Sequence, residues 1–147
     1  MRAVVQRVSK ASVEVEGRVL ARIKRGLVVL LAIAKDDAQA DIDYMVDKIT
    51  NLRIFEREGK FDLSVKDVGG KILLISQFTL YGDTKKGRRP SFTDAAPLIV
   101  AKELYEIALK KFGDAIQTKG GEFQAHMSVN IVNDGPVTII IDSKRNL

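Results

Sequence analysis

The sequence contains no cysteine and a single histidine, His126. Without cysteine the chain has no disulfide, no thiolate nucleophile and no thiolate ligand for a metal. A zinc site needs several nitrogen or sulfur ligands, which one histidine cannot supply, so no metal is expected. A Ser-His-Asp relay could use only His126, and no serine lies in the G-x-S-x-G pattern that would accompany it. We therefore expect His126 to be structural or to face solvent.

The sequence also lacks the glycine-rich patterns that bind nucleotide phosphates, G-x-x-x-x-G-K-[ST] and G-x-G-x-x-G. No cofactor is expected. The longest apolar run, residues 27–34, is far too short to cross a membrane as a helix. The first residues lack the apolar stretch of a signal peptide. We therefore expect a cytoplasmic protein that makes no membrane contact.

The composition is that of an ordinary globular protein with a basic excess. Its 147 residues, 46% of them hydrophobic, suffice for one core and predict a single domain over residues 1–147. The net charge is +5, and the cations concentrate at Lys85, Lys86, Arg88 and Arg89. Such a cluster is either a solvated loop or a contact for phosphates. Both interpretations stay open on the local sequence.

Hydrophobic periodicity predicts the order of the secondary structure. Segments rich in β-branched residues predict strands at residues 2–8, 12–16, 18–24, 27–34 and 71–76, and two more near the C-terminus. Apolar residues at helical spacing predict an amphipathic helix from about Ala38 to Leu52 and another from Pro97 to about Phe112. Between strand and second helix, residues 83–97 form a long polar stretch, which is typical of a functional or disordered loop.

This order predicts an α+β fold. We expect a layered, largely antiparallel β-sheet, a barrel-like ββα arrangement, with two main helices. Two helices are few for so many strands, so part of the sheet needs further cover. A second sheet layer or a dimer partner would supply it.

The stretch Ser76–Leu80 stands where a buried strand ends and the polar loop begins. Scaffolds commonly present functional groups at such positions. Ser76 and Thr79 offer hydroxyls, Gln77 an amide, and Phe78 an aromatic face that can stack on a base. Threonine without a basic partner is a poor nucleophile, so a site here would work by positioning, with backbone N–H groups around an oxyanion. The alternative is an ordinary strand end with one capping hydroxyl.

A Gly-Pro pair, Gly135–Pro136, interrupts the β-branched residues near the C-terminus. Proline has no N–H for a strand ladder, and glycine marks a sharp turn or a close approach. Asn133 to Pro136 is therefore expected to separate two strands as a hairpin turn. The alternative is that the Gly-Pro backbone is itself a functional tip.

With these stretches in view, the chain resembles the D-aminoacyl-tRNA deacylases of the D-tyrosyl-tRNA deacylase family. The resemblance covers almost the full length. It rests on Met1–Val8, Ser76–Leu80, Gly87–Phe92 and Asn133–Thr138, which follow one another in the order and at the separations of the family. It implies the fold of these deacylases.

The resemblance implies an enzyme that hydrolyses the ester between a D-amino acid and the terminal adenosine of tRNA, and that also removes mischarged glycine. It implies a homodimer with two active sites at the interface, and no DNA partner. Ser76, Gln77, Phe78 and Thr79 would lie beside the ester. The backbone N–H groups of Gln77 and Phe78 would face the oxyanion, and the tRNA 2′-hydroxyl would assist the reaction. Attack by the Thr79 hydroxyl is the second possibility, after assistance by the tRNA 2′-hydroxyl.

In such enzymes a cis Gly-Pro peptide, here Gly135–Pro136, enters the active site of the partner subunit. Its carbonyls would take the α-ammonium of the substrate, and its bulk would exclude an L-amino acid. Asn133 and Thr138 belong to the same motif. Arg7 resembles the residue that holds the tip in place. The basic cluster at residues 85–89 would contact tRNA.

Met127 would line the substrate pocket. One departure from the family lies nearby, because Gln124 stands where the family has glycine, and the pocket shape and the tolerance for glycine depend on it. Two rival functions stay open. One is a non-catalytic RNA-binding module that uses the basic cluster and Phe78, and the other is a dimeric structural domain.

Overall fold

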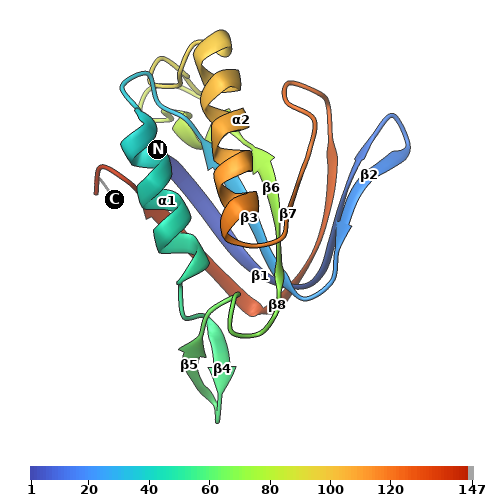
Figure 1. Ribbon diagram of the computed structural model, residues 1–147. Coiled ribbons are helices and arrows are strands. Elements are labelled where there is room, and N and C mark those ends of the chain that lie inside the picture. Colours follow the sequence, from blue (N-terminus) through green and yellow to red (C-terminus); the bar gives the residue numbers. More distant parts are fainter. Residues whose placement is uncertain (146–147) are drawn as a thin grey trace.

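The computed structural model describes residues 1–145. Two helices and a short hairpin accompany a six-stranded sheet (Figure 1). The sheet consists of β1 (Arg2–Val15), β2 (Arg18–Ile23), β3 (Gly26–Ala32), β6 (Lys71–Ser76), β7 (Thr118–Gly120) and β8 (Ser128–Asp142). The other elements are α1 (Gln39–Thr50), the hairpin β4 (Phe55–Arg57) and β5 (Lys60–Leu63), the 3-10 turn η1 (Phe78–Tyr81) and α2 (Leu98–Ala115).

The helix predictions are confirmed, with α2 continuing to Ala115, three residues beyond the predicted end at Phe112. The two segments predicted as strands at residues 2–8 and 12–16 form one continuous strand, β1. No helix in the described residues is long and apolar enough to cross a membrane.

The sheet is mixed. Strand β1 pairs antiparallel with β2 and β3 along one edge and with β8 along the other. Strands β3, β6 and β7 pair in parallel. Each parallel pair is joined by a crossover that contains a helix, α1 between β3 and β6 and α2 between β6 and β7. The expected antiparallel sheet is therefore correct for the pairs of β1, and the helical crossovers account for the parallel remainder.

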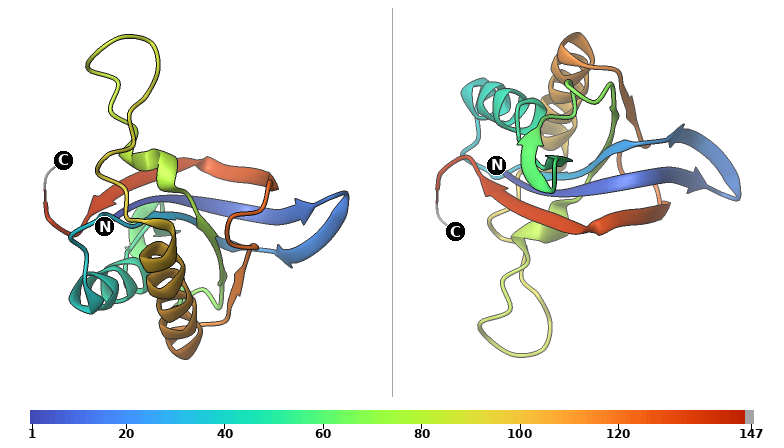
Figure 2. Two further views of the ribbon diagram at one scale, coloured as in Figure 1. Left: turned by 90° about the horizontal axis from the view of Figure 1, so that it is seen from above. Right: turned by 90° about the horizontal axis from the view of Figure 1, so that it is seen from below.

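Both helices cover the same face of the sheet (Figure 2). Ile42, Met45 and Ile49 of α1 and Phe112 of α2 are buried there against β1, β3 and β6. A second apolar cluster fills the opposite face, between β1, β2, β6 and the start of β8. Strand β2 also contacts β6 and β7, so the sheet curls, as the barrel-like prediction required.

The predicted hairpin at Asn133–Pro136 is wrong. Residues on both sides of it belong to one strand, β8, which runs antiparallel to β1 throughout. Gln6 pairs with Thr138 and Val8 with Asn133, so the intervening residues of β8 leave the ladder as a bulge. The chain does not reverse there. The Gly-Pro pair bends the strand outward because proline cannot donate to the ladder.

Close backbone approach at Gly26 joins β3 to β6. A Cβ at Gly26 would lie 1.9 Å from the carbonyl oxygen of Lys71, its pairing partner. Gly113 in α2 is the opposite case, because a Cβ there would meet nothing within 4 Å.

Gly26→Ala is therefore expected to lower the free energy of unfolding by at least about 3 kcal/mol, because the parallel pair must separate. Gly113→Ala is the matched control, and we expect it to raise the stability by about 0.5–1 kcal/mol through helix propensity. Urea unfolding of both variants measures the difference. Equal stabilities would contradict the close approach.

Candidate active site at the end of strand β6

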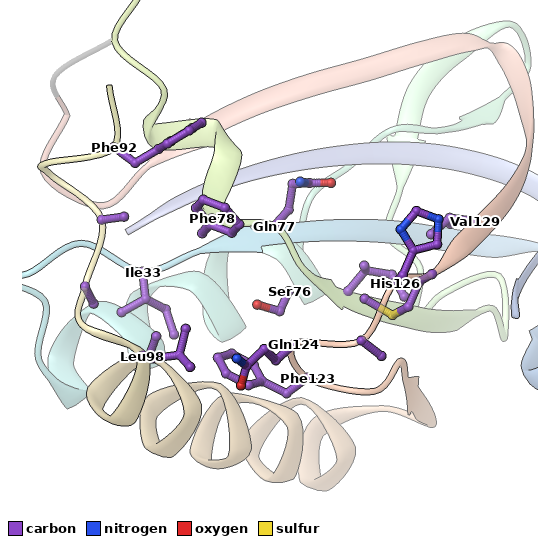
Figure 3. A pocket seen from close by; sticks show the side chains of 16 residues that line it. Ile33, Ser76, Gln77, Phe78, Phe92, Leu98, Phe123, Gln124, His126 and Val129 are labelled. Atoms are coloured by element: carbon purple, nitrogen blue, oxygen red, sulfur yellow. The ribbon is translucent and has the colours of Figure 1, made fainter. Parts of the chain in front are cut away.

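A cavity of about 500 Å³ opens where β6 ends (Figure 3). Ser76, Gln77 and Phe78 line it, together with Phe92 and residues from the start of α2. Another wall comes from Phe123 to Met127, in the segment that leads into β8, and from Val129 at the start of β8. The volume suits a small organic ligand, and most of the lining is apolar.

Two backbone N–H groups are free at this strand end. The N–H of Gln77 donates to the carbonyl of Leu31 at 2.8 Å, which continues the β3–β6 pairing. Its expected role as an oxyanion donor is therefore wrong. The N–H groups of Phe78 and Thr79 open η1, and no acceptor for either is found within the described residues. A free pair of this kind can bind an anion or a polarised carbonyl oxygen.

Thr79 is exposed and does not line the cavity. Its hydroxyl accepts a hydrogen bond from the side-chain amide of Gln77. An amide cannot take a proton from a hydroxyl, so this contact does not activate Thr79 as a nucleophile.

Aromatic side chains form much of the wall. Phe78, 55% exposed, meets Phe92 edge to face with ring centroids 5.0 Å apart. Phe123 lies against Tyr105, which is buried and donates its hydroxyl to the carbonyl of Leu74 at 2.9 Å. Burial raises the pKa of Tyr105 to about 12, so this hydroxyl stays protonated at neutral pH and supports the wall without serving as a base.

Gln124, His126 and Met127 lie on the last segment of the wall. Gln124 has φ +67°, a left-handed conformation that favours glycine, and its side chain reaches along the cavity beside Phe123 (Figure 3). Met127 lines the cavity as expected, and its sulfur would lie 2.6 Å from a Cβ at Gly121. His126 is exposed at the end of the cavity away from Leu98.

The site is poor in groups that exchange protons. Among the described residues, His126 is the one titratable residue that lines the cavity. Within the described residues, no three His, Asp or Glu side chains lie close enough together to hold a metal ion. The electrostatic character of the site therefore comes from backbone N–H groups.

The second predicted feature, the Gly135–Pro136 tip, stands on the β8 bulge. Its peptide is cis, as the resemblance implied, and both residues are exposed. Arg7 is buried beneath it and donates from Nε to the carbonyl of Asp134 at 2.9 Å. Arg7 also donates from Nη1 to the carbonyl of Ile54 at 2.8 Å, which ties the bulge to the segment before β4.

Asn133 closes the base of the bulge. Its Oδ1 accepts the N–H of Val137 at 2.8 Å, and its Nδ2 donates to the Thr138 hydroxyl at 3.1 Å. Gln6 of β1 donates to the same hydroxyl at 3.2 Å. At Gly135, φ is +135° and a Cβ would lie 2.8 Å from the side chain of Val137. The tip is thus held on both sides and admits no side chain at Gly135.

Within one chain, the Gly135–Pro136 tip does not lie at the cavity. Arg7, Asn133, Gly135, Pro136 and Thr138 do not line the cavity. The cavity instead uses residues that sequence patterns did not single out, chiefly Ile33, Leu98 and Phe123. Phe92 ends the motif Gly87–Phe92, which was the one available indication for that wall.

The basic cluster lies on an exposed loop that projects on the side of the sheet opposite the helices (Figure 2). Asp83 and Ser91 close the loop through paired backbone hydrogen bonds of 2.7 and 2.9 Å. Lys85, Lys86, Arg88 and Arg89 form no ion pair with the described residues. Phe92, just beyond the loop, connects it to the cavity through Phe78.

Two free N–H groups beside an apolar cavity, with no nucleophile–base pair among the described residues that line it, suit a site that acts by positioning a polarised carbonyl group. The family model for D-Tyr-tRNA(Tyr) deacylase matches residues 4–142. The chain therefore belongs to the D-Tyr-tRNA(Tyr) deacylase family, as its resemblance predicted, and it is an enzyme of the D-aminoacyl-tRNA deacylase class.

Individual relatives agree with this assignment. The chain is 55% identical over 146 residues to a D-aminoacyl-tRNA deacylase from Kosmotoga olearia, with 99% of each chain covered. It is 56% identical over 148 residues to one from Desulfitobacterium hafniense, again with 99% of each covered.

Solved structures also match. One, described as a c-Myc DNA unwinding element binding protein, has a TM-score of 0.92 and 45% identity, covering 97% of this chain and 98% of the other. Another, described as a probable eukaryotic D-amino acid tRNA deacylase, has a TM-score of 0.82 with 18% identity, covering 95% and 97%. The second likeness concerns the fold alone.

Asn133→Ala should release the base of the bulge, because the Val137 N–H loses its acceptor. We expect hydrogen exchange of the Val137 amide to accelerate by about tenfold or more, as loss of one hydrogen bond predicts. Asn130→Ala is the control on the same strand, since its side chain makes only a 3.4 Å contact with Ser12. Unchanged exchange at Val137 in Asn133→Ala would contradict the clamp.

Proposed function

We propose that this chain hydrolyses the ester of D-aminoacyl-tRNA and releases the D-amino acid and free tRNA. The observation that carries the proposal is the pair of free N–H groups at Phe78 and Thr79, beside an apolar cavity in a chain of the deacylase family. These N–H groups would hold the ester carbonyl oxygen as it gains negative charge. The amino acid would lie toward Phe123 and Gln124.

The chemistry would proceed without a side-chain base. The oxygen of a water molecule bonds to the ester carbon, the bond to the ribose oxygen breaks, and that oxygen takes a proton. The adjacent 2′-hydroxyl of the terminal ribose would relay the proton between water and leaving oxygen. Two observations support this route over attack by Thr79. The Thr79 hydroxyl contacts the Gln77 amide, and the titratable side chain in the cavity lining, His126, is exposed at the end away from Leu98.

Chiral selection would come from a second copy of the chain. The Gly135–Pro136 tip is exposed and held rigidly by Arg7 and Asn133, yet it stands apart from the cavity of its own chain. A tip that enters the partner's cavity could accept the α-ammonium through its carbonyls and exclude an L side chain by bulk. Glycine esters would pass the same test, because glycine has no side chain to exclude.

A homodimer would also cover exposed apolar surface. Ile139 and Ile141 pack toward the helices, so Ile140 between them points to the opposite face, where it is 64% exposed. Val132, on the same strand beyond the bulge, is 45% exposed. Val132 points to the other face of the strand, because its neighbour Ile131 packs into the second apolar cluster. An interface along β8 would bury Ile140 and place the tip against the partner.

The basic loop would contact the phosphates of tRNA. The loop that carries these four cations projects from the side of the sheet that carries η1 (Figure 2), and no carboxylate of the described residues pairs with them. Binding of this kind is salt-dependent and carries no sequence preference.

The activity itself is tested with D-tyrosyl-tRNA and L-tyrosyl-tRNA. We expect the D ester to be hydrolysed at least about 10²-fold faster, a difference of about 2.7 kcal/mol in transition-state stabilisation. Release of the amino acid from each ester measures the ratio. Equal rates would contradict chiral selection, and salt-dependent tRNA binding without hydrolysis would favour the RNA-binding module.

Thr79→Ala distinguishes the two chemical routes. Assistance by the 2′-hydroxyl predicts that the variant keeps kcat within about tenfold of the original enzyme, because only an exposed hydroxyl is lost. A loss of more than about 10³-fold with an intact fold would make Thr79 the nucleophile. Single-turnover rates on D-tyrosyl-tRNA, with circular dichroism as the fold control, give the answer.

A further inference from the structure

A second cavity, of about 300 Å³, adjoins the candidate active site. The β1–β2 turn supplies Glu16 and Arg18 to its lining, and the segment after β7 supplies Glu122. Ala125 and His126 line both cavities, so a single stretch of chain forms the wall between them.

The charged residues of this second cavity have no evident structural task. Glu16, Arg18 and Glu122 are exposed, and none of them takes part in an ion pair within the described residues. Unpaired charges that converge on a hollow next to an active site are candidates for ligand contacts.

The β1–β2 turn places Glu16 in the lining of this cavity. Val15 pairs with Arg18, so Glu16 and Gly17 form a two-residue hairpin turn with φ +50° and +75°. The same two residue types form the β4–β5 turn, where Glu58 and Gly59 have φ +52° and +76°, so the turn conformation itself needs no functional explanation. Glu16 differs from Glu58 in its position, because its carboxylate lines the cavity beside Arg18 and Glu122.

The charge pattern selects the ligand. Two carboxylates repel a phosphate, but they accept hydrogen bonds from the exocyclic amine of a nucleobase. Arg18 can donate to the ring nitrogen and carbonyl oxygen beside that amine, and His126 offers a ring on which a base can stack. Cytosine presents this order of one amine donor followed by two acceptors, whereas uracil presents a carbonyl in place of the amine.

We propose that the second cavity binds the cytosine that precedes the terminal adenosine in the C-C-A end of tRNA. This inference rests on the proposed function and extends it to a neighbouring subsite. With the ester at Phe78, the second cavity lies beyond the His126 end of the first cavity (Figure 3), because the two cavities share Ala125 and His126. Glu16 and Glu122 would accept the cytosine amine, and Arg18 would fix the opposite part of its edge.

The test compares small substrates that lack the rest of the tRNA. They are 3′-D-tyrosyl-adenosine, the same ester extended on its 5′ side by cytidylate, and the same ester extended by uridylate. We expect the original enzyme to prefer the cytidylate substrate over the adenosine ester at least about tenfold in kcat/KM, and over the uridylate substrate by a similar factor, since each hydrogen-bonded base edge contributes this order of discrimination.

Glu16→Ala combined with Glu122→Ala removes both acceptors of the amine, so it should abolish the preference for cytidylate and leave hydrolysis of the adenosine ester unchanged. Glu103→Ala, at an exposed carboxylate of α2 outside both cavities, is the control and should keep the preference. Glu16→Asn suits the left-handed turn, so it should fold at least as stably as the original while it weakens the preference.

A cytidylate preference that survives in the double variant would overturn the inference, as would an equal loss on all the substrates. A uridylate substrate that performs as well as the cytidylate one would overturn it too. An original enzyme that hydrolyses none of the D-tyrosyl esters, D-tyrosyl-tRNA included, would instead contradict the proposed function. The two failures are therefore distinguishable.

Discussion

The antiparallel pairing of β1 with β8 is the constraint on which the site depends. It joins the two ends of the chain along almost the whole length of both strands, from Arg2 opposite Asp142 to Glu14 opposite Ser128. At its outer end β8 begins immediately after the segment that closes the cavity. In its middle the ladder opens into the bulge that carries Gly135 and Pro136. One strand therefore fixes both features, and a shift of its register would displace them together.

Arg7 compensates for backbone hydrogen bonds that the bulge in β8 loses. A bulge leaves backbone groups unpaired, and a buried guanidinium that donates to two carbonyls replaces part of what the ladder loses. Lysine has the charge but not the planar fork, so it could not reach both carbonyls in this geometry. Asn133 restores a further bond by accepting the Val137 N–H. The tip is rigid because side chains replace the missing sheet partners.

Local sequence predicted the elements well and their long-range pairing poorly. The hydrophobic pattern predicts helix α1 and strand β6, because the burial of one helix face or of a central strand requires apolar residues at regular positions along that segment. The Gly135–Pro136 stretch looked like a hairpin because the same residues interrupt a ladder in both cases. Only the partner strand distinguishes a turn from a bulge, and β1 lies more than a hundred residues away in sequence. The Gln77 N–H was misassigned for the same reason, since its acceptor, the Leu31 carbonyl, belongs to another strand.

The cavity wall was the hardest part to foresee. Ile33, Leu98 and Phe123 come from separate elements and follow no common pattern, so only the fold brings them together. In this cavity the apolar side chains form the walls, and backbone N–H groups provide the polar contacts. A site with so few acid–base side chains must bind its substrate accurately, because it contributes geometry and fixed dipoles in place of proton transfer. Backbone groups suit that task, since the sheet and η1 fix the N–H groups of Phe78 and Thr79 and no rotamer has to be ordered when substrate arrives. Close backbone packing also explains why glycine is required at Gly26 and Gly135. A side chain at Gly26 would collide with the backbone of β6, and one at Gly135 would collide with Val137.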